Sequence, residues 1–200
     1  MTDTNEIEFC EEWLSLKKSH FKIIAVATVL ADNKRAFRGS LNDLCAEIGV
    51  NPSSVNKRNI KEALASLEEN GYIKMIVDGR TYTVSLAESV KNSKNVKTIK
   101  KAWYDLIRTT KSEEGCGWDS MLKVFIVLCD CATGTLATDI SVAEQLGNSI
   151  SGSTVGKCIR TLCKMDFEDF RFISKSENRR DNAGNYYCIG REIDRGIFFE

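Results

Sequence analysis

The stretch "SLNDLCAEIG", residues 40–49, is matched 98 positions later by "TDISVAEQLG", residues 138–147. Each copy begins with a hydroxyl residue, Ser40 or Thr138, whose side-chain oxygen is suited to capping a helix N-terminus. Ser40 is followed three residues later by Asp43, which is close to a capping box. Each copy ends in a glycine, where a helix can stop in a left-handed turn. The pattern predicts the same short helix twice, and therefore a repeated domain.

A second helix is predicted after each copy. In the first copy, Asn51 is the expected N-cap and Pro52 the first helical residue, where a missing N–H costs nothing. In the second copy, Ser151 or Ser153 begins the helix. The apolar positions of the two second helices match at the same spacing of 98: Ile60, Leu64 and Leu67 against Cys158, Leu162 and Met165. Helix, short turn and helix form a helix-turn-helix.

A β-hairpin is predicted after the second helix. In "GYIKMIVDGRTYTVSL", residues 71–86, Asp78-Gly79 supplies a two-residue turn. The expected pairs are Val77 with Arg80, Met75 with Tyr82, and Ile73 with Val84. Ile73, Met75, Tyr82 and Val84 would then share the buried face. The second copy has strand-like segments at 170–176 and 185–190, joined by a longer tip.

Apolar segments at 21–31 and 121–132 precede the two repeats and are predicted as buried first helices. Three helices followed by a β-hairpin resemble the winged-helix superfamily, twice, over about residues 19–90 and 118–195. The resemblance implies an α+β, mainly α, fold with two winged-helix domains and a helical linker. The expected parts are residues 1–90, 91–111 and 112–200. In architecture, the pair resembles plasmid and phage replication initiators and mobile-element regulators.

Two further segments are predicted to be helical because their apolar residues recur at helical spacing. The first is 6–17, with Ile7, Cys10, Trp13 and Leu14 on one face. The second is 95–108, with Val96, Ile99, Trp103 and Leu106. The second stripe fits packing on a neighbouring domain better than a coiled-coil dimer seam. Because 1–16 is acidic and 91–111 is basic, the two segments are also candidates to neutralise each other.

Composition points to an ordinary globular protein, with 28 basic and 28 acidic residues and a net charge of zero. The acidic N-terminus lacks a signal-peptide pattern, and the apolar runs are shorter than the roughly 20 residues that span a bilayer. We therefore expect a cytoplasmic protein without membrane partners, whose eight cysteines are reduced. The pairs Cys129/Cys131 and Cys158/Cys163 do not match zinc-site spacing, so no metal or cofactor is expected.

"GNSISGSTVGKC", residues 147–158, resembles a phosphate-binding loop, and this would imply a nucleotide hydrolase. The motif fails because Ser151 stands where the first glycine belongs, Cys158 stands where a magnesium-binding hydroxyl belongs, and a helix precedes it. No nucleophile has an identifiable base, so the expected protein is not an enzyme.

The predicted recognition helices carry the main functional signal. The second helix of a helix-turn-helix enters the major groove of DNA with its N-terminal residues. The candidate DNA-contact residues of the first copy are Ser53, Ser54, Asn56, Lys57, Arg58 and Lys61. Those of the second copy are Ser153, Thr154, Lys157, Arg160 and Lys164. No acidic residue occurs in 49–61 or in 147–164, although the whole chain is neutral.

The hairpin tips add Arg80 in the first copy and Arg179 and Arg180 in the second, as basic arms that reach the DNA backbone or minor groove. The expected partner is double-stranded DNA, bound by a transcriptional regulator or a replication-initiator-like factor. The alternative is a winged-helix adaptor that joins other proteins without touching DNA. A homodimer is compatible with either function.

Overall fold

The computed structural model describes residues 6–88, 95–129, 135–167, 170–177 and 185–189. The chain divides into two compact units, 1–101 and 102–200, and each is described by itself. The boundary falls inside the segment 91–111 that was predicted as a linker. Both units are built of α-helices and small antiparallel sheets, which confirms the α+β class.

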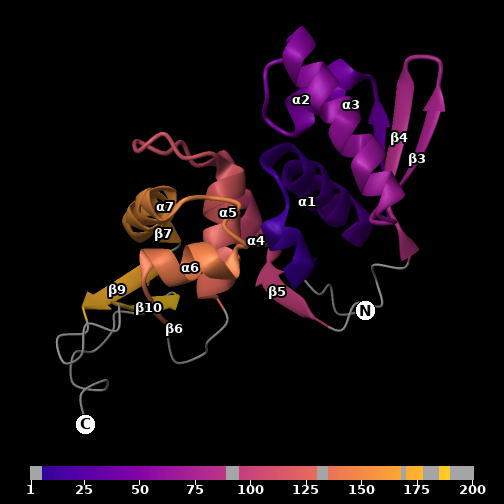
Figure 1. Cartoon of the computed structure of the whole chain (residues 1–200). Helices are drawn as coiled ribbons and strands as arrows, with labels where there is room; N and C mark the ends of the chain where they lie inside the picture. The colour runs from indigo at the N-terminus through magenta and orange to yellow at the C-terminus, as the bar shows by residue number, and fades with distance from the viewer. Residues whose placement is uncertain (1–5, 89–94, 130–134, 168–169, 178–184, 190–200) are drawn as a thin grey trace. The chain divides into compact units, whose positions relative to one another are not determined.

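Unit 1 runs from β1 to β5 (Figure 1). Its helices are a 3-10 helix η1 (Glu11–Ser15), α1 (Lys18–Asp32), α2 (Leu41–Glu47) and α3 (Ser54–Glu69). Its strands are β1 (Glu6–Cys10), β2 (Phe37–Gly39), β3 (Ile73–Asp78), β4 (Thr81–Leu86) and β5 (Val96–Lys100).

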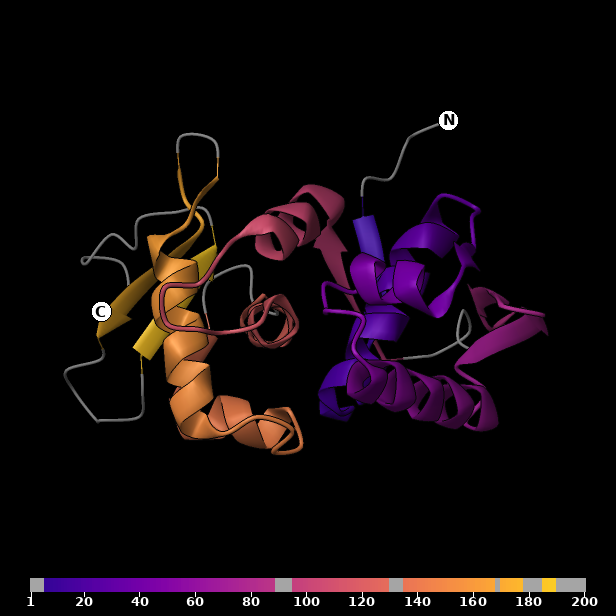
Figure 2. The same cartoon turned by 90° about the horizontal axis from the view of Figure 1, so that it is seen from above.

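Unit 2 contains the helices α4 (Lys101–Thr109), α5 (Trp118–Leu128), α6 (Asp139–Gln145) and α7 (Gly152–Lys164). Its strands are β6 (Thr135–Ala137), β7 (Asp166–Phe167), β8 (Phe170–Arg171), β9 (Ile173–Glu177) and β10 (Asn185–Ile189). Figure 2 shows α7 crossing α6 at a steep angle. None of the helices in the described parts of either unit is long and apolar enough to cross a bilayer.

The two units repeat the same local chemistry at the predicted spacing. Ser40 and Thr138 both cap a short helix through a reciprocal capping box. Gly49 and Gly147 both have positive φ, at 68° and 59°, as expected for glycines that follow a helix. The unpredicted strands β2 and β6 also lie 98 residues apart and hold matching places in the sheet orders β2-β4-β3 and β6-β10-β9.

The predicted first helices are present as α1 and α5. In unit 1, α1 packs against α3 and β4. The side chains that form this core include Phe21, Ile24, Leu64, Leu67 and Val84, all nearly inaccessible to solvent. In unit 2, α5 packs against α7, and Trp103, Phe125 and Phe172 form an aromatic cluster.

The first hairpin has the predicted strands but a different turn. Asp78 pairs with Thr81, so the two-residue loop is Gly79-Arg80, with the glycine at φ 57°. The expected pairs are wrong by two positions, since Met75 lies opposite Val84 and Ile73 opposite Leu86. A shift of two keeps every side chain on the same face of the sheet. Ile73 and Val84 are buried as predicted, while Met75 and Tyr82 are half-buried.

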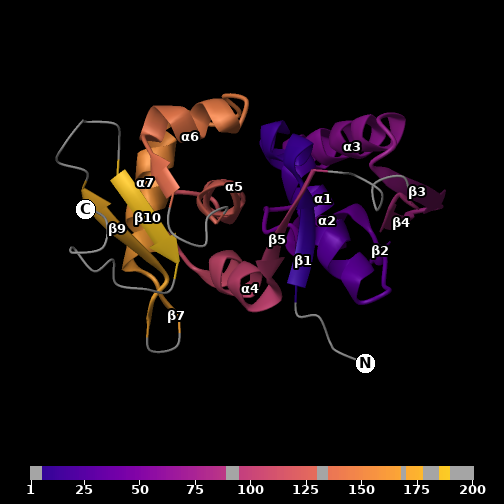
Figure 3. The same ribbon diagram turned by 90° about the horizontal axis from the view of Figure 1, so that it is seen from below.

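The prediction of a helix over residues 6–17 is partly wrong, because only Glu11–Ser15 is helical, as a 3-10 helix. Residues 6–10 form β1, which pairs antiparallel with β5 and is followed by η1 (Figure 3). Ile7 and Phe9 are buried, in the period-two pattern of a strand. The predicted helix over 95–108 is also partly wrong, because it is helical only from Lys101.

One ion pair of the kind expected between the two segments is present in the described residues. Lys97 Nζ of β5 lies 2.9 Å from Glu11 Oε1 of η1. The predicted apolar stripe of 95–108 is divided between a strand and a helix. In its helical part, Trp103 packs edge-on against Phe125, with ring centroids 5.6 Å apart. This is packing within unit 2, as the sequence favoured over a dimer seam.

Candidate nucleic-acid interface

Two of the predicted contact residues build the turn at the start of α3. Ser53 is the N-cap, and its hydroxyl oxygen accepts a hydrogen bond from the Asn56 backbone N–H at 3.2 Å. The Asn56 side chain donates through Nδ2 to the Asn51 carbonyl oxygen at 2.8 Å. The helix therefore begins at Ser54, and the prediction of Asn51 as N-cap and Pro52 as first helical residue is wrong. Ser53 and Asn56 hold the turn in shape.

The remaining predicted residues of α3 form a basic surface. Ile60, Ala63, Leu64 and Leu67 face inward, while Ser54, Arg58 and Lys61 are exposed and Lys57 is half-buried. No acidic residue occurs in the first turn of α3, so the positive end of the helix dipole adds to these cations. An anion such as a phosphate is therefore favoured at this end of α3.

Sequence reasoning missed Asn59, which is exposed beside Arg58 on α3. Its side chain offers the donor and acceptor pair that reads adenine in the major groove, the role predicted for Asn56. The signal that could have identified it is the helical period, since Asn56 lies four residues before the buried Ile60 on the same face of the helix, whereas Asn59 does not.

The pairing of Arg58 with Glu62 leaves this basic surface available. Arg58 Nε lies 3.9 Å from Glu62 Oε1, and the two side chains are 70% and 68% exposed. Pairs of such exposed charges contribute little, because water and salt screen them. The guanidinium can exchange this partner for a phosphate or a base.

The hairpin of unit 1 places Arg80 at its exposed tip. On β3, just before the tip, Ile76 and Val77 are also exposed, at 67% and 50%. The second hairpin is described only in its strands, so Arg179 and Arg180 lie outside the described residues.

The first turn of α7 is closed by hydroxyl groups that were predicted to contact DNA. Ser151 is the N-cap, and its hydroxyl oxygen lies 3.0 Å from that of Ser153 and 3.0 Å from that of Thr154. The Thr154 backbone N–H donates to the same Ser151 oxygen at 3.3 Å. This confirms Ser151 as one of the two predicted helix starts and gives Ser153 and Thr154 partners within the cap.

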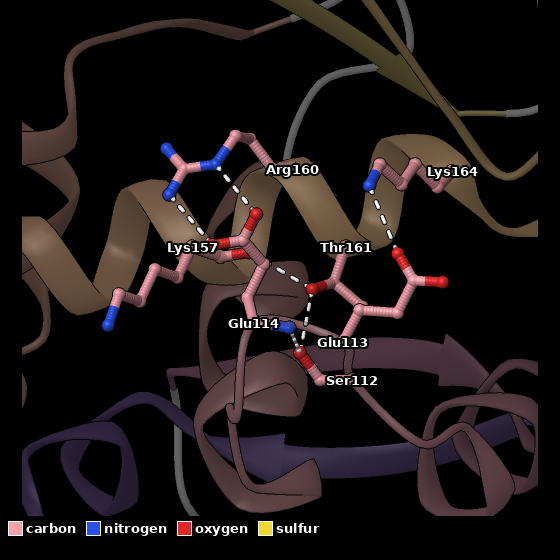
Figure 4. Close-up of polar contacts among 7 residues, drawn as sticks. All are labelled: Ser112, Glu113, Glu114, Lys157, Arg160, Thr161 and Lys164. Atoms are coloured by element: carbon pink, nitrogen blue, oxygen red, sulfur yellow. Dashed lines mark hydrogen bonds and ion pairs between the residues drawn. The ribbon is translucent and has the colours of Figure 1, made fainter.

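The cations of α7 differ from those of α3 in their surroundings. Arg160 donates through Nε and Nη2 to the two carboxylate oxygens of Glu114, at 3.3 and 3.1 Å (Figure 4). Lys164 Nζ donates to Glu113 Oε2 at 3.3 Å. Lys157 is exposed, and Figure 4 shows its ammonium group pointing away from both glutamates.

The pKa shifts of Glu114 and Arg160 agree with the ion pair between them. The hydrogen bond from Arg160 lowers the pKa of Glu114, and the same bond raises the pKa of Arg160. Asp139, the first residue of α6, adds to the rise in the pKa of Arg160. It approaches α7 so closely at Gly156 that an added Cβ there would collide with the Asp139 carboxylate. Arg160 therefore has two carboxylates close by.

The two helices also differ in their buried faces. At the spacing of 98, Lys57 and Lys61 of α3 correspond to Val155 and Ile159 of α7, which are buried. The repeat is therefore exact in its caps and turns but not in the position of its cations.

A pocket of about 420 Å³ in unit 1 has the wrong charge for nucleic acid. Its lining includes the carboxylates of Glu6, Glu8 and Asp32. Among the residues that the structure describes, no cluster of three or more histidine, cysteine, aspartate or glutamate side chains could hold a metal ion.

The chain matches no protein-family model, no curated protein and no solved structure. We therefore infer function from the geometry of α3, α7 and the first hairpin.

Proposed function

We propose that the protein is a non-enzymatic, duplex-DNA-binding protein whose two units are winged-helix domains, and that α3 is its main recognition helix. The observation that carries the proposal is the exposed, acid-free N-terminal half of α3 with Lys57, Arg58 and Lys61. A transcriptional regulator or a replication-initiator-like factor would use such a surface.

The chemistry of this surface suits both parts of DNA recognition. Lys57, Lys61 and the N-terminal end of α3 are suited to phosphates, which position a protein on the duplex. Arg58 and Asn59 are suited to the edges of guanine and adenine. Arg80 at the hairpin tip would contact the adjacent backbone or minor groove. Because the net charge is zero, attraction to DNA would be confined to this surface.

The test is binding to fluorescent duplex DNA across a salt series, with the variant Arg58→Gln/Lys61→Gln. We expect at least tenfold weaker binding, roughly, and a log K against log salt slope that is smaller by about 1, since Lys61 is the phosphate contact that is lost while Arg58 is a base contact. Lys18→Gln/Arg35→Gln is the matched control, because it removes the same charge from exposed residues at the two ends of α1. Wild-type binding at background at low salt would refute the proposal, and so would equal losses in the two variants.

A second candidate function, a protein–protein adaptor, is favoured by exposed Ile76 and Val77 on β3. Because successive side chains on a strand point to opposite faces, each face of this hairpin offers one exposed apolar side chain to a protein partner. The adaptor function predicts no salt-dependent DNA binding by the wild type, and loss of partner proteins from the Ile76→Lys/Val77→Lys variant.

A further inference from the structure

The segment between α4 and α5 lies along the outer side of α7. Ser112 Oγ lies 2.9 Å from Thr161 Oγ1 and accepts a hydrogen bond from the Glu114 backbone N–H at 3.2 Å. The next two side chains, Glu113 and Glu114, contact Lys164 and Arg160 (Figure 4). Three consecutive residues therefore contact three positions on one side of a helix.

The bonds formed by these glutamates are those that a phosphate would form. The Arg160 guanidinium donates two parallel hydrogen bonds to one carboxylate, and the same fork is suited to the oxygens of a phosphodiester. Lys164 supplies a point charge one helical turn further along α7. The side chains of Glu113 and Glu114 thus occupy the place of two backbone anions.

We propose that the outer face of α7 is a second DNA-backbone surface, whose cations Arg160 and Lys164 are occupied by the carboxylates of the Ser112–Glu114 segment in the free protein, while Lys157 beside them is exposed. This inference rests on the proposed function, because it names the same partner for a second helix. The segment acts as a built-in competitor, so duplex DNA is first bound through α3.

The contacts between the Ser112–Glu114 segment and α7 allow the two glutamate side chains to leave the helix. The side chains of Lys164 and Glu113 are 63% and 84% exposed, so salt and competing anions act directly on this pair. Ser112 is tied to Thr161, whose residue is buried, and it can stay in place while the glutamates move. Gly115 follows them at φ 75°, in the left-handed region that glycine adopts without strain.

The experiment compares Glu113→Gln/Glu114→Gln with a matched control, Glu69→Gln/Glu144→Gln. Both double variants remove two negative charges from helix or loop surfaces, but Glu69 and Glu144 are exposed and lie outside the segment. We expect the first variant to bind duplex DNA roughly fivefold more tightly than the control at low salt. Its salt slope should be steeper by about 2, since two phosphates are added.

A second pair of variants identifies the surface. Arg160→Gln/Lys164→Gln should change the affinity of the otherwise wild-type chain less than about twofold, because these cations are paired with Glu114 and Glu113. In the Glu113→Gln/Glu114→Gln background, the same change should abolish the gain. Circular dichroism of each variant checks that the fold is retained.

The two proposals fail in different ways. If the wild type binds duplex DNA through Arg58 and Lys61 but the Glu113→Gln/Glu114→Gln variant behaves like its control, the second surface is refuted and the proposed function stands. Equal loss from Arg160→Gln/Lys164→Gln in both backgrounds also refutes the inference, since the glutamates would then not compete with DNA for α7. If no variant binds DNA at low salt, the proposed function itself is refuted.

Discussion

A buried lysine is the most unusual single residue of unit 2. Lys123 of α5 is 1% exposed, and its Nζ donates to the Ser149 hydroxyl oxygen at 3.0 Å. Burial lowers the pKa of Lys123 to about 8, although the charge of Asp119 one turn earlier opposes the fall. The ammonium group therefore costs stability wherever it stays protonated.

This residue predicts a pH dependence of stability. Below pH 8, Lys123 is protonated in both the folded and the unfolded chain. Between pH 8 and about 10.5, the unfolded chain keeps the proton that the folded chain has lost, so the free energy of unfolding rises with pH. We expect the wild type to gain on the order of 1 kcal/mol per pH unit, at most, relative to Lys123→Met over this window.

Urea denaturation at a series of pH values measures this difference. Subtracting the free energy of unfolding of the variant from that of the wild type removes the contribution of buried thiols. One such thiol is that of Cys158, whose pKa is raised by burial. The exposed Lys18→Met variant is the control and should show no such trend. A difference between wild type and Lys123→Met that stays flat from pH 8 to 10 would contradict the assigned burial.

Features of single residues could be predicted from the sequence where they depend on neighbouring residues. The Ser40 capping box and the left-handed Gly49 involve residues within one turn of each other, so their side-chain chemistry is readable from spacing alone. The partners of Arg160 and Lys164 were not predictable in this way. Glu114 and Glu113 lie 46 and 51 residues earlier, and only the packing of unit 2 brings them to α7.

Among the secondary-structure elements, the first hairpin depends on one glycine. Gly79 takes φ 57° in the two-residue loop, and a Cβ there would meet no atom within 4 Å. The loss of stability on replacing Gly79 with a larger residue therefore comes from the backbone conformation alone. We expect Gly79→Ala to lower the free energy of unfolding by about 1–2 kcal/mol, because L-residues disfavour the left-handed region.

Thermal unfolding of Gly79→Ala and Arg80→Ala distinguishes strain from loss of charge. Arg80→Ala changes the next residue of the same loop without placing a Cβ at positive φ, so its stability should stay within about 0.5 kcal/mol of wild type. Gly79→Asn should be less damaging than Gly79→Ala, since asparagine tolerates this conformation better. Equal effects of Gly79→Ala and Arg80→Ala would refute the assigned loop.

The elements that were predicted wrongly have their partners far away in the sequence. Ile7, Cys10, Trp13 and Leu14 fit a helical face by spacing, and a strand followed by a 3-10 helix places the same residues inward. What decides between the two is β5, about 90 residues later, which supplies the backbone partners of β1. The helices of the repeat needed no such partner, and they were predicted correctly apart from the start of α3.

The whole molecule has zero net charge. The salt dependence of DNA binding therefore reports on the cations at the binding surface. If α3 and the hairpin tip bind DNA, the cations involved are Lys57, Arg58, Lys61 and Arg80. Because Arg58 is assigned to a base edge, the three phosphate contacts of Lys57, Lys61 and Arg80 give a slope of log K against log salt between roughly −2 and −3 for the wild type. Fluorescence anisotropy at five or more salt concentrations measures it.

A slope beyond roughly −6 would mean that the cations of α7 take part already in the wild type. The Arg80→Gln variant is the internal check and should reduce the slope by about 1. A slope near zero would leave no role for phosphate contacts and would contradict DNA binding by α3.

The ribbon of β1 and β5 joins the first described residues of unit 1 to its last. Glu6 lies opposite Lys100, and α4 begins at the very next residue, Lys101. In the described part of the chain, β5 has β1 as its only strand neighbour. Deleting residues 1–10 would therefore remove the strand that supplies the backbone hydrogen-bond partners of β5. A change in β1 would thus act directly on β5, the last strand of unit 1, although the two strands lie about 90 residues apart in the sequence.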